Sequence, residues 1–129
     1  SQRFGITDIC YYSSVTILTS KPYTQTEIEQ LKELFEVYIK TAIDIDRKIC
    51  VAGMDRHFEG EQMLLSEGSR QRNIWGGGID LETMEIDYNS FINIRPNDKN
   101  LKNEIQSEIL KQKYKELTEY FFKNLYVAN

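Results

Sequence analysis

Two short segments of alternating polarity constrain the fold of this chain more than any other feature. In residues 41–46, Ile43 and Ile45 fall on one side of an extended chain and acidic residues on the other, and residues 49–54 repeat the pattern. A period of two is typical of a half-buried β-strand. The link 46–48 between the segments is short enough for a tight hairpin. The pair therefore predicts two neighbouring antiparallel strands.

A helix is predicted before this hairpin. Thr24 and Glu27 are spaced as a capping box, in which each side chain satisfies a backbone amide at the start of a helix. From there to about Lys40, apolar residues recur every three or four positions, at Ile28, Leu31, Leu34, Phe35 and Tyr38. That spacing predicts an amphipathic helix with one stripe facing a core. Residues 14–19, rich in β-branched side chains, predict a strand before it.

The second half of the chain predicts four more elements. They are a short helix over about 59–67 that ends at Gly68, a strand over 73–81, and a strand over 85–95 that Pro96 closes. A final helix is predicted from Asn97 or Asp98 to about Leu125. Its inward-facing residues are Ile105, Ile109, Tyr114, Leu117, Phe121 and Leu125. The order is β-α-β-β-α-β-β-α. We expect an α+β domain with an antiparallel or mixed sheet of about five strands and three helices mainly on one face. The first two strands, joined through a helix, are expected to be parallel neighbours.

The composition indicates a globular protein that does not favour polyanionic partners. The 129 residues are enough for one domain, 1–129, with residues 1–13 as an N-terminal arm. The net charge of −4 disfavours nucleic acid or an anionic membrane as a partner of the whole chain, and no apolar run approaches the about 20 residues that span a bilayer. We expect a cytoplasmic protein in which Cys10 and Cys50 are buried free thiols.

The only histidine lies four residues before an acid. If a helix begins at His57, Glu61 lies on the same face and can orient the imidazole, so that His57 acts as a general base. The alternative is a polar helix start at which the charged form of His57 is disfavoured. Both interpretations remain open at this level.

Trp75 is followed by three glycines inside a predicted strand. Such a run weakens a strand and marks the close approach of another group. It matches no phosphate-binding motif, so the glycines either admit a ligand or clear space for the Trp75 ring or the final helix.

The predicted strand 85–95 places polar side chains on its outer face. Asn93 and Arg95 point the same way, beside Asn89 and Phe91, and Arg95 offers a planar fork for a carboxylate or phosphate. The segment 69–72 can approach this face. A ligand site is therefore predicted from Arg95, Asn93, Gln71, Ser69 and Trp75. The alternative is an internal ion pair of Arg95 with Asp80, Glu82, Asp87 or Glu61.

No metal site and no cofactor are predicted. Four acids, Asp80, Glu82, Glu85 and Asp87, surround one turn, but their spacing is not that of a calcium loop. One histidine and two distant cysteines do not supply a zinc site. Ser69 and Ser90 offer hydroxyls without the partners of a nucleophile.

Two blocks of this sequence resemble a known family. H-F-E-G-E-Q-M-L-L-S-E-G-S-R-Q-R-N-I-W-G and S-F-I-N-I-R-P-N-D-K-N are similar to the pattern of a family of small uncharacterised prokaryotic proteins, a domain of unknown function, over about residues 15 to 125. The matching positions are His57, Glu61, Leu64, Leu65, Gly68, Ser69, Gln71, Trp75, Gly76, Ser90, Asn93, Arg95, Pro96 and Asn100. The chain departs from the family at Gly77 and Gly78, where the family has an asparagine and an aromatic residue. The resemblance implies no activity, substrate or cofactor.

Three functional hypotheses follow. The first is a binding or regulatory domain, able to form a homodimer, that presents Asn93, Arg95, Gln71 and Trp75 to a protein partner or an anionic ligand. The second is a small enzyme with His57 as base, Glu61 orienting it, and Arg95 with Asn93 holding an anionic substrate. In the third, the polar cluster is an internal network that fixes the loop 68–74 and binds no ligand.

Overall fold

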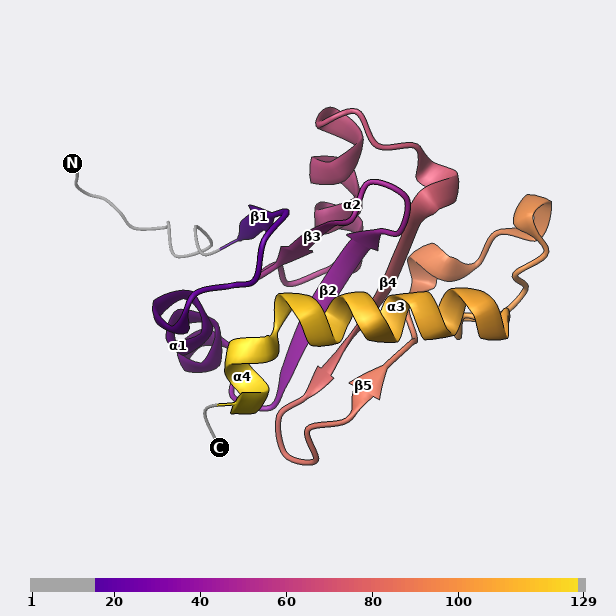
Figure 1. Cartoon of the computed structure of the whole chain (residues 1–129). Helices are drawn as coiled ribbons and strands as arrows, with labels where there is room; N and C mark the ends of the chain where they lie inside the picture. Colours follow the sequence, from indigo (N-terminus) through magenta and orange to yellow (C-terminus); the bar gives the residue numbers. More distant parts are fainter. Residues whose placement is uncertain (1–15, 128–129) are drawn as a thin grey trace.

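The computed structural model describes residues 16–127 and shows one antiparallel sheet with helices on both faces (Figure 1). The strands are β1 (Ile17–Thr19), β2 (Tyr38–Asp44), β3 (Ile49–Ala52), β4 (Ile74–Asp80) and β5 (Ile86–Asp87), and the helices are α1 (Gln25–Leu34), α2 (His57–Ser66), α3 (Glu108–Phe121) and α4 (Lys123–Val127). The strand order is β1-β3-β2-β4-β5. The α+β class and the β2–β3 hairpin are confirmed. The predicted arm, residues 1–13, and Cys10 lie outside the described residues.

Two predictions about the first half of the chain are wrong. The capping box of Thr24 and Glu27 forms, but α1 ends at Leu34 rather than near Lys40. Residues from Tyr38 onward instead join β2, because the full length of β4 offers them backbone partners from Tyr38↔Asp80 to Asp44↔Ile74. β1 is also not a neighbour of β2. It pairs antiparallel with β3, which lies between them.

The two faces of the sheet carry separate apolar clusters. α1, α3 and α4 cover one face, where the larger cluster includes Tyr23, Ile43, Trp75, Tyr114 and Phe121. α2 covers part of the other face, over a smaller cluster of Ala42, Val51, Met54, Leu64 and Ile74. Figure 1 shows α3 crossing the sheet over β2 and β4. Within residues 16–127, no helix has both the length and the apolarity to cross a membrane.

The glycines of β4 leave space for neighbouring groups. A Cβ on Gly77 would lie 2.2 Å from the Asp87 carbonyl oxygen and 2.9 Å from a ring carbon of Tyr114 on α3. A Cβ on Gly78 would lie 2.4 Å from the Tyr38 hydroxyl. Real Cβ atoms do not come so close to other atoms, and the backbone oxygen cannot move away cheaply. The glycines therefore clear space for the final helix and for side chains on both faces.

The predicted strand 85–95 is correct only at its beginning. β5 ends at Asp87, and the chain then forms the short 3₁₀ turns Phe91–Asn93 and Pro96–Asp98. The last helix starts later than predicted, at Glu108, where Ser107 accepts a hydrogen bond from the Leu110 amide. Ile109, predicted to face inward, is 71% exposed. Within the segment 88–106, strand-like pairing is limited to the isolated bridges Asn89↔Glu104 and Arg95↔Asn100, so other contacts fix the segment against β4.

Candidate functional site

Asn93 holds this irregular segment against β4. Its side chain is fully buried, and its Oδ1 accepts a hydrogen bond of 2.8 Å from the Gly76 amide. Its Nδ2 donates to the carbonyl oxygens of Gly76 and Asn103, both at 2.9 Å. Because β5 pairs with β4 only at Gly78 and Ile79, the Gly76 backbone has no strand on that side. The Asn93 amide takes the place of the missing strand.

Arg95 donates hydrogen bonds to the same edge of β4, at Ile74, two residues before Gly76. Its guanidinium donates to the carbonyl oxygens of Gln71, at 2.6 Å, and of Ile74, while its Nε donates to Ile92 at 3.0 Å. Its Cζ lies 4.3 Å from the centre of the Trp75 ring. Burial lowers the pKa of Arg95, and the charges of Glu61 and Asp98 oppose that shift. Arg95 thus holds the loop before β4 in place and covers one face of the Trp75 ring.

The expected solvent-facing position of Asn93 and Arg95 is therefore wrong. Asn93 is fully buried and Arg95 is 8% exposed, because both side chains turn inward to the free edge of β4. Among the described residues, the recorded ion pairs all involve Lys111, so Arg95 does not form the predicted pair with an acid. This geometry corresponds to the internal network of the third hypothesis.

Asn100 is a second buried amide in the same segment. Its Nδ2 donates to the carbonyl oxygens of Asn93 and Glu104 at 2.9 and 3.0 Å, and its Oδ1 accepts from the Gln106 amide at 2.8 Å. Sequence reasoning gave it no role of its own, although it was one of the positions on which the family resemblance was based. Two buried amides thus replace regular secondary structure over residues 88–106.

His57 is the first residue of α2 and packs on the face of the sheet opposite α3. Its Nε2 lies 2.7 Å from the Gly77 carbonyl oxygen. Because a carbonyl only accepts, Nε2 carries the hydrogen, and Nδ1 keeps its lone pair in the neutral ring. Burial lowers the pKa of His57, with Lys40 adding to the effect. The ring is therefore neutral near pH 7.

Glu61 does not orient His57. It is buried, and its Oε2 lies 3.4 Å from the Nε2 of Gln71, while the Gly77 carbonyl fixes the His57 tautomer. The predicted pairing of His57 with Glu61 is thus replaced by two separate contacts. Ser69 is also largely buried, with its Oγ 3.5 Å from a guanidinium nitrogen of Arg47.

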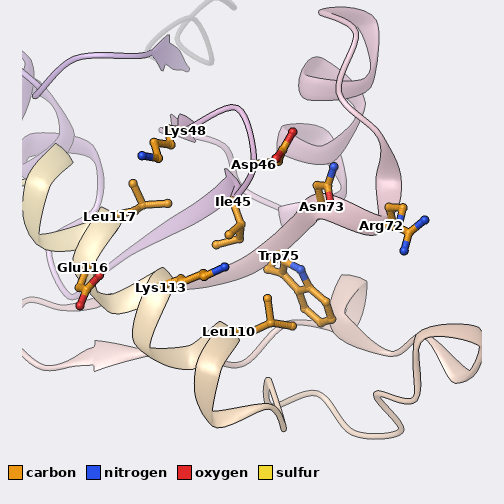
Figure 2. Close-up of a pocket in the computed structure, with 10 residues that line it drawn as sticks. All are labelled: Ile45, Asp46, Lys48, Arg72, Asn73, Trp75, Leu110, Lys113, Glu116 and Leu117. Atoms are coloured by element: carbon orange, nitrogen blue, oxygen red, sulfur yellow. The ribbon is translucent and has the colours of Figure 1, made fainter.

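A hollow of about 580 Å³ lies between α3, the β2–β3 turn and the start of β4. We call it the basic hollow; its lining is Ile45, Asp46, Lys48, Arg72, Asn73, Trp75, Leu110, Lys113, Glu116 and Leu117. Figure 2 shows Trp75 and Leu110 side by side at its base, with the Lys113 side chain running from α3 toward Trp75. Of the predicted site residues, Trp75 lines this hollow. His57, Asn93 and Arg95 are not part of its lining.

A second hollow of about 490 Å³ adjoins the first. It shares Asp46, Arg72 and Asn73 with the basic hollow and adds Arg47, Gly68 and Arg70. We call it the arginine extension. Its arginines come from two chain segments, the β2–β3 turn and the loop after α2, which the fold brings together.

The two hollows concentrate positive charge in an acidic protein. Five of the chain's 16 Lys and Arg residues line them, but only two of its 20 acidic residues, Asp46 and Glu116. The recorded ion pairs of residues 16–127 include none of these cations. An anion that enters therefore meets unpaired positive side chains above an apolar base.

Sequence reasoning found only part of this surface. It noted Arg70 and Arg72 but assigned them to the face of Asn93 and Arg95, and it gave Lys48 and Lys113 no role. The available signal was the spacing of Leu110, Lys113 and Leu117, which places all three on one side of a helix. What that side faces depends on the packing of α3.

Comparison with known proteins identifies a family and no functional relative. No curated protein and no solved structure matches the chain. Within residues 16–127, no group of three or more His, Cys, Asp or Glu side chains is placed to hold a metal ion. A family model described as "Protein of unknown function (DUF5674)" matches residues 17–121. The chain belongs to this family, DUF5674.

Proposed function

We propose that this protein is a binding domain for a small organic anion, which occupies the basic hollow. The observation that supports the proposal best is the set of cationic side chains around an apolar base. Lys48, Arg72 and Lys113 approach the hollow from three different segments. The lining holds three cations against two acids, Asp46 and Glu116, and none of these cations forms an ion pair within residues 16–127. A bound anion therefore lowers the repulsion among the cations.

The size and lining of the hollow fit a small molecule. About 580 Å³ lies within the roughly 300–1,000 Å³ typical of ligand pockets. Ile45, Leu110 and Leu117 can bury an apolar body beside Trp75, while the cations of the lining select its charge. This mixture favours an organic anion over a bare inorganic ion.

The residues first predicted as ligand contacts take different roles in this proposal. Trp75 is part of the wall, and Gln71 and Ser69 belong to the loop that carries Arg70 and Arg72. Arg95 is a positioning residue, because it holds the Gln71 carbonyl and one face of Trp75. Asn93 supports the loop indirectly through β4.

An enzyme that uses His57 is less well supported. The base and its predicted orienter do not touch, and the groups meant to hold the substrate are engaged with backbone carbonyls. The Gly77 carbonyl does select the tautomer that leaves Nδ1 free. His57 contacts the Gly77 carbonyl and Arg95 the Gln71 and Ile74 carbonyls, so the two side chains serve separate parts of the fold.

The cellular setting stays a prediction. The buried Cys50, whose thiol pKa is raised to about 12 by burial, suits a reducing compartment such as the cytoplasm. A homodimer remains a prediction as well. Sedimentation at several protein concentrations would test it, and a single monomeric species throughout would contradict it.

Anilinonaphthalene sulfonate, an organic anion with an aromatic body, is a direct probe of the proposed function. We expect it to bind the folded protein, and we expect Arg72→Ala and Lys113→Ala each to weaken binding about fivefold, the range of one partly screened charge contact. Lys32→Ala, which removes an exposed lysine from α1, is the matched control. Equal binding by all four proteins would contradict the proposal.

A further inference from the structure

We propose that the anion is a nucleoside phosphate that occupies both hollows. Its base lies in the apolar end of the basic hollow, its sugar at the junction, and its phosphate in the arginine extension. This inference rests on the proposed function and adds the class of ligand to it. Three chemically different zones in a row support it.

The apolar zone suits a flat ring. Leu110 and Leu117 of α3 line this zone together with Trp75 and Ile45 (Figure 2). Arg95 covers one face of the Trp75 ring, and the buried ring is only 3% exposed. The ring thus forms a fixed, almost fully covered floor, and we expect a base to pack mainly against Ile45 and the two leucines beside it.

The arginine extension suits a phosphate. Arg47, Arg70 and Arg72 line it, and arginine presents a planar fork of donors that matches phosphate oxygens. The Arg47 guanidinium is anchored by a 2.7 Å hydrogen bond from its Nη1 to the Glu67 carbonyl oxygen. Several of its N–H groups remain for a ligand.

Gly68 keeps this anchored guanidinium close to the loop. Its φ of +99° lies in the region that favours glycine, and a Cβ there would lie 3.4 Å from the Arg47 Nη1. The loop after α2 can therefore turn directly over Arg47. Arg70 and Arg72 of that loop then line the extension together with Arg47 of the β2–β3 turn.

The junction can hold hydroxyl groups beside the phosphate. Asp46, Arg72 and Asn73 line both hollows, so they mark where the two meet. The Asp46 carboxylate repels a phosphate but accepts hydrogen bonds from sugar hydroxyls. This acid therefore favours a ligand whose hydroxylated part sits between its ring and its phosphate, which is the order of groups in a nucleotide.

Isothermal titration with AMP, adenosine and inorganic phosphate tests the assignment. We expect AMP to bind at least about tenfold more tightly than either fragment, because one tenfold step in affinity corresponds to about one good additional contact. Fluorescence of Trp75, the only tryptophan, provides a second signal from the hollow itself. Equal affinities for AMP and adenosine would overturn the placement of the phosphate.

Two variants separate the zones. Arg70→Ala is expected to weaken AMP about tenfold and to leave adenosine unchanged, because it removes a phosphate contact only. Asp46→Asn is expected to reduce the preference for AMP over dAMP about threefold. Lys32→Ala should change none of these affinities. A loss of adenosine binding in Arg70→Ala equal to the loss of AMP binding would contradict the zoning.

Failure of this inference can be told apart from failure of the proposed function. If anilinonaphthalene sulfonate binds in an Arg72-dependent way and AMP does not displace it, the nucleotide assignment is wrong and the anion site stands. If neither compound binds, both are wrong. If a single-stranded oligonucleotide binds more than about tenfold more tightly than AMP, the ligand is a polymer and the nucleotide assignment is again overturned.

Discussion

Two polar regions lie on either side of Trp75, and they use their polar groups in opposite ways. On the inner side, Asn93 and Arg95 form hydrogen bonds with the backbone of β4 and of the loop before it. On the outer side, Lys48, Arg72 and Lys113 line a hollow and take part in none of the ion pairs recorded for residues 16–127. The first arrangement stabilises the fold. The second leaves charge available for a ligand.

The difference shows that residue type does not by itself separate a binding group from a structural one. An arginine and an asparagine on a predicted strand look like a ligand-binding face. In the folded chain they complete a strand edge, because β5 ends after two residues. The following predictions test this division, from the largest expected effect to the smallest.

Asn93→Leu should destabilise the fold most. The substitution keeps the volume but leaves the Gly76 amide and carbonyl without partners inside the protein, which costs about 3 kcal/mol or more in total. Urea denaturation followed by circular dichroism would measure the loss. Asn97→Leu, at an exposed asparagine of the same segment, is the control and should change stability by less than about 0.5 kcal/mol. A similar cost for both variants would break the comparison.

Arg95→Lys should cost about 2 kcal/mol despite the retained charge. A lysine cannot reach the Gln71 and Ile74 carbonyls together, and it loses the planar contact with Trp75. We expect Trp75 fluorescence to report a changed environment in the still-folded protein. A variant with wild-type stability and fluorescence would show that the guanidinium geometry is unimportant.

Arg72→Ala, on the outer side, should weaken anion binding and leave stability almost unchanged. The side chain is exposed and its charge has no acidic partner, so stability should change by less than about 0.5 kcal/mol while binding of anilinonaphthalene sulfonate weakens. Denaturation and fluorescence titration of the same sample would separate the two quantities. A large loss of stability would move Arg72 to the structural group.

We expect the titration of His57 to give a small dependence of stability on pH. Burial lowers the pKa of the folded ring below the ordinary value of 6.5, so the unfolded chain binds the proton more readily. The contribution of His57 to the free energy of unfolding should therefore be fully present above about pH 6.5, and it should decline as the pH falls from there through the lowered pKa. His57→Gln, which can still donate to the Gly77 carbonyl, should remove this decline. An unchanged slope between about pH 7 and pH 5 in the variant would assign it to other groups.

Some elements follow from the chain's own pattern. The capping box at Thr24 and the β2–β3 hairpin are local signals, and both form as predicted. The alternation predicted one solvated face for these strands, but both of their faces are buried. The end of α1 was not predictable in this way. Phe35 and Tyr38 continue a helical spacing, yet the pairing of Tyr38 with Asp80 on β4 outweighs that local preference.

The sequence by itself determined the α+β class, the hairpin and the start of the first helix. Only the tertiary structure decided which polar groups face inward. Asn93 and Arg95 turn inward because the short β5 leaves the edge of β4 without backbone partners. Lys48, Arg72 and Lys113 meet because α3 crosses the sheet near the β2–β3 turn. Both outcomes depend on contacts between residues far apart in the chain, which local spacing does not encode.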